Sequence, residues 1–377
     1  MELAAAPPPG AIRPGRPGLS GSRPIRVMVC DDSAFIRSVF TRVLAQDSAI
    51  EVVGRAANGK DALDQVLRQP DLADVMLLDI EMPVMDGLTA LPQLLAAAPA
   101  LRVIIASTLT TRGATTTFEA LRLGAVDYVP KPSAATLAGD VSFQHELLAK
   151  IRGLARPGRD SASGTSPPPR PLALRTTLAS QPQLLAIGSS TGGPQALLSL
   201  LRSLKAHLGG AGLTIPVVVT QHMPAAFTPL LADQLDRLSG LPCAEAVDGA
   251  PLLPGRVHLA PGGRHLIITR TPAGLVGRLN DGPPENFCRP SVDSMLRSAA
   301  EACGGRVLVL MLTGMGHDGL AGTQALVAQG AAAMAQDEAS SVVWGMPGAI
   351  ARAGLCQAVL PLDAMADRAA RSLRGAA

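Results

Sequence analysis

A serine flanked by glycines is the first candidate for chemistry in this chain. Residues 184–194 read LLAIGSSTGGP, in which the stretch GSSTG (188–192) fits the pattern G-x-S-x-G. This pattern holds a nucleophilic serine, here Ser190, at a sharp turn between a strand and a helix, and glycines permit such a tight turn. The N-terminus of the next helix would offer N–H groups to a developing oxyanion. An ordinary glycine-rich loop or a phosphate nest has the same appearance, so the assignment requires a base and an acid elsewhere.

Two later segments supply those partners. His222 follows the apolar run IPVVVT, and Asp318 lies in TGMGHDG, directly after the apolar run RVLVLML. Both residues, like Ser190, come at the carboxyl end of a predicted strand, where open parallel sheets place their sites. A serine, a histidine and an aspartate that meet there can act as nucleophile, base and orienting acid in acyl transfer. Their order in the chain differs from the Ser, Asp, His order of α/β-hydrolases, which argues against an ordinary member of that class.

The loop that carries Asp318 also has a second interpretation. Residues 314–319 match the dinucleotide fingerprint G-x-G-x-x-G after a strand, and Asp337 follows further along the chain. Such a match predicts a Rossmann-type cofactor site. However, a carboxylate inside the loop would repel a pyrophosphate, and His317 is bulky for the close approach that the fingerprint requires. We therefore favour the triad and keep dinucleotide binding as a competing hypothesis.

The N-terminal half carries another group of polar residues at strand ends. Apolar runs alternate with helical patterns at βα spacing over residues 25–130, which predicts a doubly wound parallel sheet of the flavodoxin-like kind. The ends of its strands carry Asp31, Asp32, Asp79, Ser107 and Lys131. Three carboxylates at one edge repel one another unless a hard divalent cation binds, so we expect Mg²⁺. A carboxylate can also attack a phosphoryl group, whose oxygens Ser107 and Lys131 would then bind.

Length and composition indicate the class of protein. A chain of 377 residues is long enough for two or three domains, and 47% hydrophobic with 17% charged residues is typical of a globular protein. A formal net charge of +3 does not indicate nucleic-acid binding. Five cysteines without C-x-x-C pairs favour reduced thiols in the cytoplasm and no zinc site. No apolar run is long enough to span a membrane.

Two segments without hydrophobic periodicity divide the chain. Residues 1–24 are rich in Pro, Gly and Arg and lack the apolar region of a signal peptide, so we expect a disordered tail. Residues 153–183 contain a proline triplet and a Ser/Gly tract, which are typical of a linker. The predicted domains are therefore 25–152 and 184–377. We expect the second to be another doubly wound α/β domain with a β-hairpin insertion, for which VHLAPGGRHLII (257–268) is the candidate.

Longer motifs resemble two known families. Residues 25–132 resemble a response-regulator receiver domain through DDS (31–33), LLDIEMPVMDG (77–87) and the KP pair (131–132). Residues from 184 to about 365 resemble the catalytic domain of the chemotaxis protein-glutamate methylesterases. The motifs that carry this second resemblance are GSSTGG (188–193), QHMP (221–224), LAPGG (259–263), RPSVD (289–293), LTGMGHDG (312–319) and VVWGMPGAI (342–350). Together the two resemblances cover most of the chain, and the combination is very specific.

The resemblance implies a role for each candidate residue. The triad would consist of Ser190, His222 and Asp318, and the loops of Thr191 and Met315 would line the oxyanion site. In the receiver domain, Asp79 would accept phosphate, and Asp31, Asp32 and Asp79 would hold Mg²⁺. The switch residues would be Ser107, Tyr128 and Lys131. We expect alanine to be tolerated at Ser189, the neighbour of the nucleophile, with most activity retained.

The function implied by the resemblance is regulated ester hydrolysis. The chain would demethylate glutamate esters on chemoreceptors, releasing methanol with no cofactor for this reaction, and could deamidate receptor glutamines through the same acyl intermediate. A chemotaxis histidine kinase would donate the phosphoryl group. We expect a cytoplasmic monomer that binds no nucleic acid and does not insert into a membrane. Two other classes stay open: a receiver joined to a dinucleotide-binding module, and a non-catalytic adaptor that only relays phosphorylation.

The positions of the two predicted sites and the linker between the domains also suggest how the enzyme would be regulated. Both predicted sites lie at the carboxyl ends of strands, and the linker 153–183 would let the receiver fold back on the esterase. We therefore expect the unphosphorylated receiver to cover the Ser190 site, and phosphorylation of Asp79 to weaken that contact.

Overall fold

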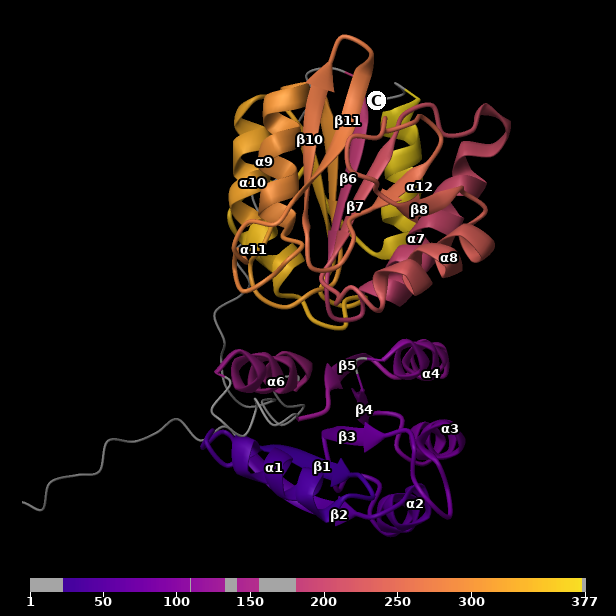
Figure 1. The fold of residues 1–377 in the computed structure, drawn as a ribbon, viewed down its shortest axis with the longest axis vertical. Helices are drawn as coiled ribbons and strands as arrows, with labels where there is room; N and C mark the ends of the chain where they lie inside the picture. Colours follow the sequence, from indigo (N-terminus) through magenta and orange to yellow (C-terminus); the bar gives the residue numbers. More distant parts are fainter. Residues whose placement is uncertain (1–22, 109, 133–140, 156–180, 375–377) are drawn as a thin grey trace, which may run out of the picture.

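A computed structural model describes residues 23–108, 110–132, 141–155 and 181–374, which form two α/β domains (Figure 1). The predicted tail, apart from its last two residues, and most of the predicted linker lie outside these ranges. In Figure 1 the N-terminal domain is drawn in indigo to purple and the C-terminal domain in pink to yellow. None of the described helices is long and apolar enough to cross a membrane.

The N-terminal domain is built on a five-stranded parallel sheet in the order β2-β1-β3-β4-β5. Its strands are β1 (Ile25–Cys30), β2 (Ile50–Ala56), β3 (Val75–Asp79), β4 (Arg102–Ser107) and β5 (Asp127–Pro130). Its helices are α1 (Ala34–Leu44), α2 (Gly59–Arg68), α3 (Gly87–Ala97), α4 (Thr111–Arg122) and α6 (Val141–Leu154). The central strand β3 is buried along its whole length, as expected for a parallel strand covered by helices on both faces. This order confirms the predicted flavodoxin-like arrangement.

The C-terminal domain contains a seven-stranded sheet in the order β14-β13-β12-β6-β7-β9-β8, with every pairing parallel. Its strands are β6 (Leu184–Ser189), β7 (Val217–Gln221), β8 (Cys243–Glu245), β9 (Val257–Leu259), β12 (Val307–Met311), β13 (Ala332–Gln336) and β14 (Ala358–Leu360). From β6 the chain winds towards β7, and from β12 it winds in the opposite direction towards β13. The boundary between β6 and β12 is therefore the switch point of the sheet, where doubly wound folds bind their ligands.

Helices cover both faces of this sheet, which confirms the predicted doubly wound class (Figure 1). One face packs against α7 (Gly193–Leu208), α8 (Thr228–Ser239) and α12 (Leu362–Leu373). The other packs against α9 (Val292–Cys303), α10 (Leu320–Ala328) and α11 (Met346–Arg352). The apolar strands between these layers are buried throughout in β6, β7 and β12.

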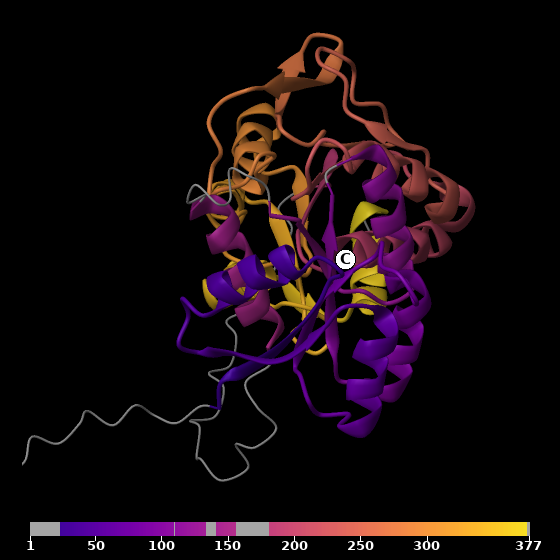
Figure 2. The same cartoon turned by 60° about the horizontal axis from the view of Figure 1, so that its bottom comes forward.

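A β-hairpin insertion is present, but the prediction placed it wrongly. The hairpin pairs β10 (His265–Thr271) with β11 (Gly274–Asn280), whereas β9 pairs in parallel with β7 and β8 in the main sheet. The glycine-rich loop after β9 therefore joins two sheets and does not reverse the chain within one. The true turn ends at Gly274, whose φ of 131° is unfavourable for other residues. Figures 1 and 2 show the turn of the hairpin at the end of the domain away from the N-terminal domain.

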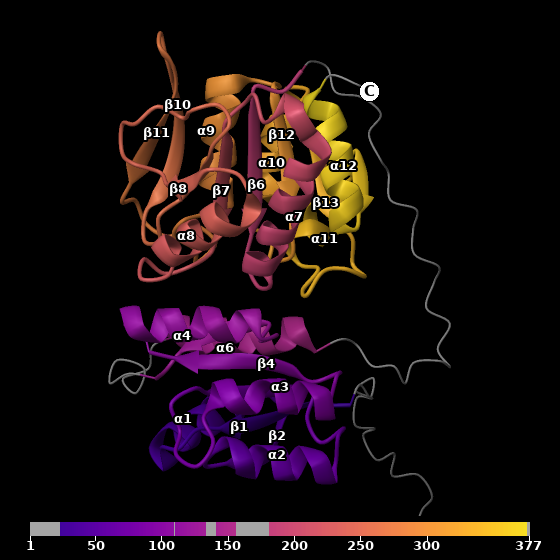
Figure 3. The ribbon, with the colours of Figure 1, turned by 90° about the vertical axis from the view of Figure 1, so that its right-hand side faces the viewer.

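The N-terminal domain lies against the C-terminal domain through β5, α4 and α6 (Figures 1 and 3). Phe118 of α4 and Tyr128 of β5 share one buried apolar cluster with Phe227, which directly precedes α8. A second cluster joins α6 to Val343, in the loop before α11. The two domains are thus held by continuous apolar packing at the carboxyl edge of the seven-stranded sheet.

Candidate active site

Three neighbouring strand ends bring Ser190, His222 and Asp318 to the switch point of the seven-stranded sheet. Ser190 follows β6, His222 follows β7, and Asp318 lies in the loop after β12. Backbone hydrogen bonds connect these ends: Ser190 N donates to Thr313 O (3.0 Å), and His222 N donates to Ser189 O (3.1 Å). The geometry therefore assembles the three residues that the sequence selected from separate segments.

His222 and Asp318 form a buried pair. His222 Nε2 lies 2.7 Å from Asp318 Oδ2, and the two side chains are 12% and 3% exposed. The carboxylate also accepts hydrogen bonds from the backbone N–H groups of Val292, Asp293 and Gly319 and from the side chains of Asn286 and Ser291. Burial would raise the pKa of Asp318, but these donors and His222 hold that pKa well below its usual range. Both oxygens have hydrogen-bond partners, so the carboxylate is held in place and orients the imidazole.

The second ring nitrogen of His222 faces a thiol. Nδ1 lies 3.4 Å from Cys288 Sγ, while Ser190 Oγ makes no hydrogen bond within the described part of the chain. Burial would lower the pKa of His222, but Cys288 and Asp318 more than offset this and raise that pKa above its usual value. The described arrangement therefore favours an imidazole that holds its proton. Cys288 is a site residue that the sequence analysis missed, since nothing local to it indicates a contact with His222.

The turn around Ser190 depends on a glutamine that the sequence analysis also missed. Gln221, the last residue of β7, accepts a hydrogen bond from Ser189 Oγ (2.7 Å) and donates to Ser190 O (2.9 Å). A Cβ atom at Gly193 would collide with the Gln221 side chain, which explains the glycine there. Because Ser189 is fully buried and supports this clamp, its replacement by alanine should disturb the turn more than we expected.

The two residues predicted for the oxyanion site lie on loops beside Ser190. The backbone N–H groups of Thr191 and Met315 make no hydrogen bond to another described residue, so both are available to an oxyanion. The side chains are engaged by the N-terminal domain. Thr191 Oγ1 donates to Asp127 Oδ2 (2.6 Å), and Met315 packs in the apolar cluster that contains α6.

The glycines of the dinucleotide-like loop have a packing role instead. A Cβ atom at Gly314 would collide with Met346 Sδ and lie 2.9 Å from the Cβ of Ser190, so the loop passes too close to Met346 and Ser190 for a side chain at this position. The Asp318 carboxylate already has six hydrogen-bond partners, five of them outside this loop. Gly316 and Gly319 have positive φ values of 79° and 92°. A Cβ atom at Gly319 would also collide with Met311 and Val292, so backbone conformation and packing account for these glycines and the geometry favours the triad over a pyrophosphate site.

In the N-terminal domain, the predicted carboxylates do meet at the sheet edge. One oxygen from each of Asp31, Asp32 and Asp79 can be chosen so that all lie within 4.8 Å of one another. Lys131 Nζ lies 2.7 Å from Asp79 Oδ2 and 3.2 Å from Asp31 Oδ2. These two buried oxygens accept no hydrogen bond of good geometry, so Lys131 is only an ion-pair partner to them. Burial raises the pKa of Asp79 to about 6 against the opposing effect of Lys131. Crowded, buried and under-bonded carboxylates suit a hard divalent cation.

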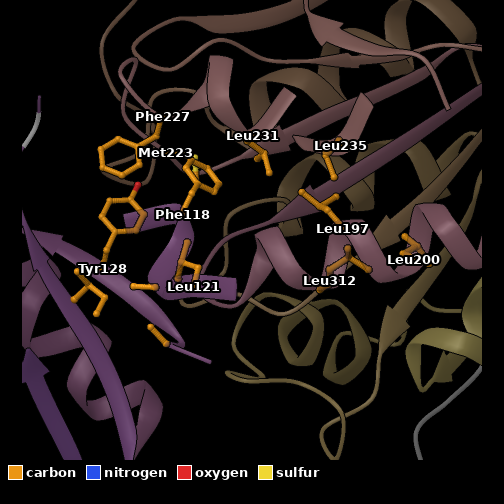
Figure 4. Close-up of a cluster of buried hydrophobic side chains, with 14 of the residues drawn as sticks. Phe118, Leu121, Tyr128, Leu197, Leu200, Met223, Phe227, Leu231, Leu235 and Leu312 are labelled. Carbon is orange, nitrogen blue, oxygen red and sulfur yellow. The ribbon is translucent and has the colours of Figure 1, made fainter. Parts of the chain in front are cut away.

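The other two predicted switch residues, Ser107 and Tyr128, bond and pack with groups other than Asp79. Ser107 Oγ is buried near α4, where it donates to Thr108 O and Gly113 O and accepts from Thr117 Oγ1. Tyr128 lies in the contact between the domains, where its ring stacks on Phe227 with centroids 4.5 Å apart and planes at 7° (Figure 4). Tyr128 is therefore placed to connect the N-terminal domain to the C-terminal domain.

A polar contact accompanies this stacking. Asp127, which bonds to Thr191, also lies 3.2 Å from Lys150 Nζ of α6. Lys150 in turn donates to Tyr128 O (2.7 Å), and its ammonium lies 5.0 Å from the centre of the Tyr128 ring. A buried network thus runs from α6 through β5 to the residue that follows Ser190.

Comparison with known proteins gives relatives for both domains. The sequence family described as CheB methylesterase matches residues 185–369, and the response regulator receiver domain matches residues 27–138. A protein-glutamate methylesterase/protein-glutamine glutaminase of Paramagnetospirillum magneticum is 51% identical over 91% of this chain and 94% of its own length. A protein of the same description from Azospirillum brasilense is 48% identical over 94% of each chain. The crystal structure of the Thermotoga maritima CheB methylesterase catalytic domain is 35% identical, covering 51% of this chain and 99% of that domain, with a TM-score of 0.48.

Proposed function

Since this chain belongs to the family of protein-glutamate methylesterases/protein-glutamine glutaminases, in which a receiver domain precedes the catalytic domain, we propose that it hydrolyses glutamate methyl esters on chemoreceptors. The observation that carries this proposal is the convergence of Ser190, His222 and Asp318 at the switch point of the seven-stranded sheet. Hydrolysis of a receptor glutamine to glutamate uses the same residues and releases ammonia in place of methanol.

The proposed reaction begins with attack by Ser190. His222 takes the proton from Ser190 Oγ as the oxygen bonds to the ester carbonyl carbon, and Asp318 holds the other ring nitrogen and stabilises the imidazolium. The N–H groups of Thr191 and Met315 receive the oxyanion. When the carbonyl re-forms, the bond to the methoxy group breaks, and His222 gives this group its proton, so methanol leaves.

The second half of the proposed reaction releases the receptor. His222, again neutral, takes a proton from water as the water oxygen attacks the acyl-Ser190 carbonyl. Collapse of this second tetrahedral intermediate breaks the bond to Ser190 Oγ, which regains a proton from His222. The product is a receptor glutamate, and no cofactor takes part.

The N-terminal domain controls this reaction in our proposal. Asp79 is the phosphate acceptor, and a chemotaxis histidine kinase is the donor. Asp31, Asp32 and Asp79 fit Mg²⁺, which would neutralise charge on the phosphoryl oxygens when bound. Lys131 pairs with Asp79 in the described state and is placed to bind a phosphoryl oxygen afterwards. We keep the ranges 1–24, 25–152, 153–183 and 184–377 for tail, receiver, linker and esterase, and we expect a cytoplasmic monomer.

We infer that the described arrangement is the inhibited one. The receiver engages both loops that would bind the oxyanion, through Asp127 on Thr191 and through α6 on Met315. Addition of a phosphodonor and Mg²⁺ to the full-length protein should raise methanol release from methylated receptor membranes by ten- to a hundredfold, equivalent to ~1.4–2.7 kcal/mol. No methanol from either sample would contradict the esterase proposal, and equal rates would contradict the inhibition.

Weakening the contact between the domains should imitate phosphorylation. Tyr128→Ala removes the ring that stacks on Phe227, and such aromatic pairs contribute ~0.5–1.5 kcal/mol beyond the area that they bury. We expect the unphosphorylated variant to release methanol about tenfold faster than the parent. Tyr128→Phe keeps the stacked ring and is the matched control, with a rate close to that of the parent. If the alanine variant is no faster, stacking of Tyr128 on Phe227 does not restrain the esterase.

A further inference from the structure

A tight turn at residues 285–288 contacts both members of the His222–Asp318 pair. Glu285 and Cys288 exchange backbone hydrogen bonds of 3.0 and 2.9 Å, which close the turn. Asn286 Nδ2 donates to Asp318 Oδ1 (3.0 Å), and Cys288 Sγ lies 3.4 Å from His222 Nδ1. The turn is therefore a common support for the acid and the base.

The backbone of this turn is strained. Asn286 and Phe287 have φ values of 52° and 63°, in the left-handed region. Asparagine tolerates this region, but an aromatic residue with a Cβ is disfavoured there. Phe287 is nevertheless 79% exposed, and its ring centroid lies 5.1 Å from that of His145 in α6. The turn thus contacts the receiver as well as the triad, and these contacts on both sides hold it in an unfavourable conformation.

The contact between Cys288 and His222 has a chemical consequence. Nε2 of His222 is occupied by Asp318, so Nδ1 is the nitrogen that must accept the proton of Ser190. The raised pKa of His222 keeps a proton on this nitrogen, beside the Cys288 sulfur. While Nδ1 keeps that proton beside the sulfur, it cannot accept another from Ser190, whose Oγ makes no hydrogen bond to a described residue.

We propose that Cys288 is a positioning residue that holds His222 Nδ1 in the docked enzyme, and that Ser190 gains this nitrogen only when the turn 285–288 shifts. This inference rests on the proposed function and names a further control point of the same site. Release of α6 from Phe287 would allow the strained turn to relax and move Cys288 away from the imidazole.

The test compares Cys288→Ala and Cys288→Ser with the parent, all as unphosphorylated full-length protein. An active-site-directed phosphonate that labels Ser190 reports how well His222 takes its proton. Loss of one hydrogen bond at Nδ1 should make labelling of the alanine variant about fivefold faster, equivalent to ~1 kcal/mol. The serine variant keeps a hydroxyl oxygen that can accept a hydrogen bond from Nδ1–H, and it should react more slowly than the alanine variant. Cys288 is half-buried, unlike the four buried cysteines, so removal of its thiol leaves the core intact.

The pH dependence of labelling provides a readout that a merely structural role would not change. The titratable groups facing His222 are Asp318 and Cys288, with Asp293 of α9 behind Asp318. Because Cys288 contributes to the raised pKa of His222, labelling by the alanine variant should reach its plateau at lower pH than labelling of the parent. The serine variant lacks this sulfur, so its plateau should also move to lower pH.

The outcomes separate this inference from the proposed function. Methanol release by the parent together with unchanged labelling rates and pH profiles in both variants would overturn the role of Cys288 alone. Absence of methanol and of Ser190 labelling in every protein would overturn the esterase function itself. Should the alanine variant fail to fold, the pH profile of the serine variant decides: an unmoved plateau overturns the role of Cys288.

Discussion

Replacement of Ser190 by alanine should abolish methanol release from methylated receptors. The residues of a catalytic triad act as a unit, and loss of the nucleophile from such a unit lowers kcat by a factor on the order of 10⁶. The fold should survive, because Ser190 is half-buried and its Oγ makes no hydrogen bond within the described residues. Methanol release by full-length Ser190→Ala, measured with a phosphodonor present, and its thermal unfolding midpoint check both statements.

Alanine variants of two other serines are the controls for this result. Ser203→Ala in α7 changes a half-buried hydroxyl that makes no hydrogen bond to a described residue, and should match the parent. Ser189→Ala breaks the bond to Gln221 and should lose part of the activity, because the turn around Ser190 loosens. Substantial activity in Ser190→Ala would show that another group is the nucleophile.

Asp318→Asn should be the next most damaging change, with a loss of about 10⁴-fold in kcat, the effect of removing the orienting carboxylate from a triad of this kind. An amide has one oxygen, whereas Asp318 accepts six hydrogen bonds on two. Asparagine therefore leaves donors unpaired and turns an N–H group towards His222 or towards a backbone N–H. The rate of methanol release and the thermal unfolding midpoint should both fall.

The pH dependence of stability gives this variant a second signature. The pKa of Asp318 is depressed in the fold, so its ionised form stabilises the native protein fully above the unfolded carboxyl pKa of about 3.9. This contribution is lost as the pH falls through the folded value. Together with Cys288, Asp318 also raises the pKa of His222 to about 10, and the stability from that effect is lost as the pH rises from the unfolded histidine pKa of about 6.5 towards the folded value. The deficit in stability of Asp318→Asn should therefore be largest in weak acid and shrink at both lower and higher pH. A deficit that does not change with pH would contradict the ionised carboxylate.

Asp337→Asn is the matched control for Asp318. Asp337 is the acid that a dinucleotide site would use, and its carboxylate accepts hydrogen bonds only from Ser340 among the described residues. The esterase proposal predicts a rate of methanol release close to that of the parent. A loss as large as that of Asp318→Asn would revive the dinucleotide interpretation of residues 314–319.

Sequence patterns predicted the parts of the site that lie at strand ends. Ser190, His222 and Asp318 each follow an apolar run, and parallel strands bring such ends to one edge regardless of their distance along the chain. Asp31, Asp79 and Lys131 were predictable for the same reason. The fold class followed from the same alternation of apolar runs and helical patterns.

The residues that were missed contact the triad from a turn or through the side chain at a strand end, where no regular pattern indicates the contact. Cys288 and Asn286 reach it through a turn whose left-handed conformation has no glycine to indicate it. Gln221 reads as the end of a strand, and only the glycine at 193 hints that a side chain crosses there. The hairpin was misplaced because a glycine-rich loop can connect two sheets as well as reverse one chain, and local sequence does not distinguish these cases.

The apolar contact between the domains makes the inhibition dependent on temperature. Phe118, Tyr128 and Phe227 are shielded from water while the receiver is docked, and opening must hydrate their rings. Hydration of apolar surface gives opening a positive heat-capacity change, and the attraction between such surfaces weakens on cooling. The unphosphorylated enzyme should therefore spend a larger fraction of its time open in the cold, so that phosphorylation matters most in a warm cell.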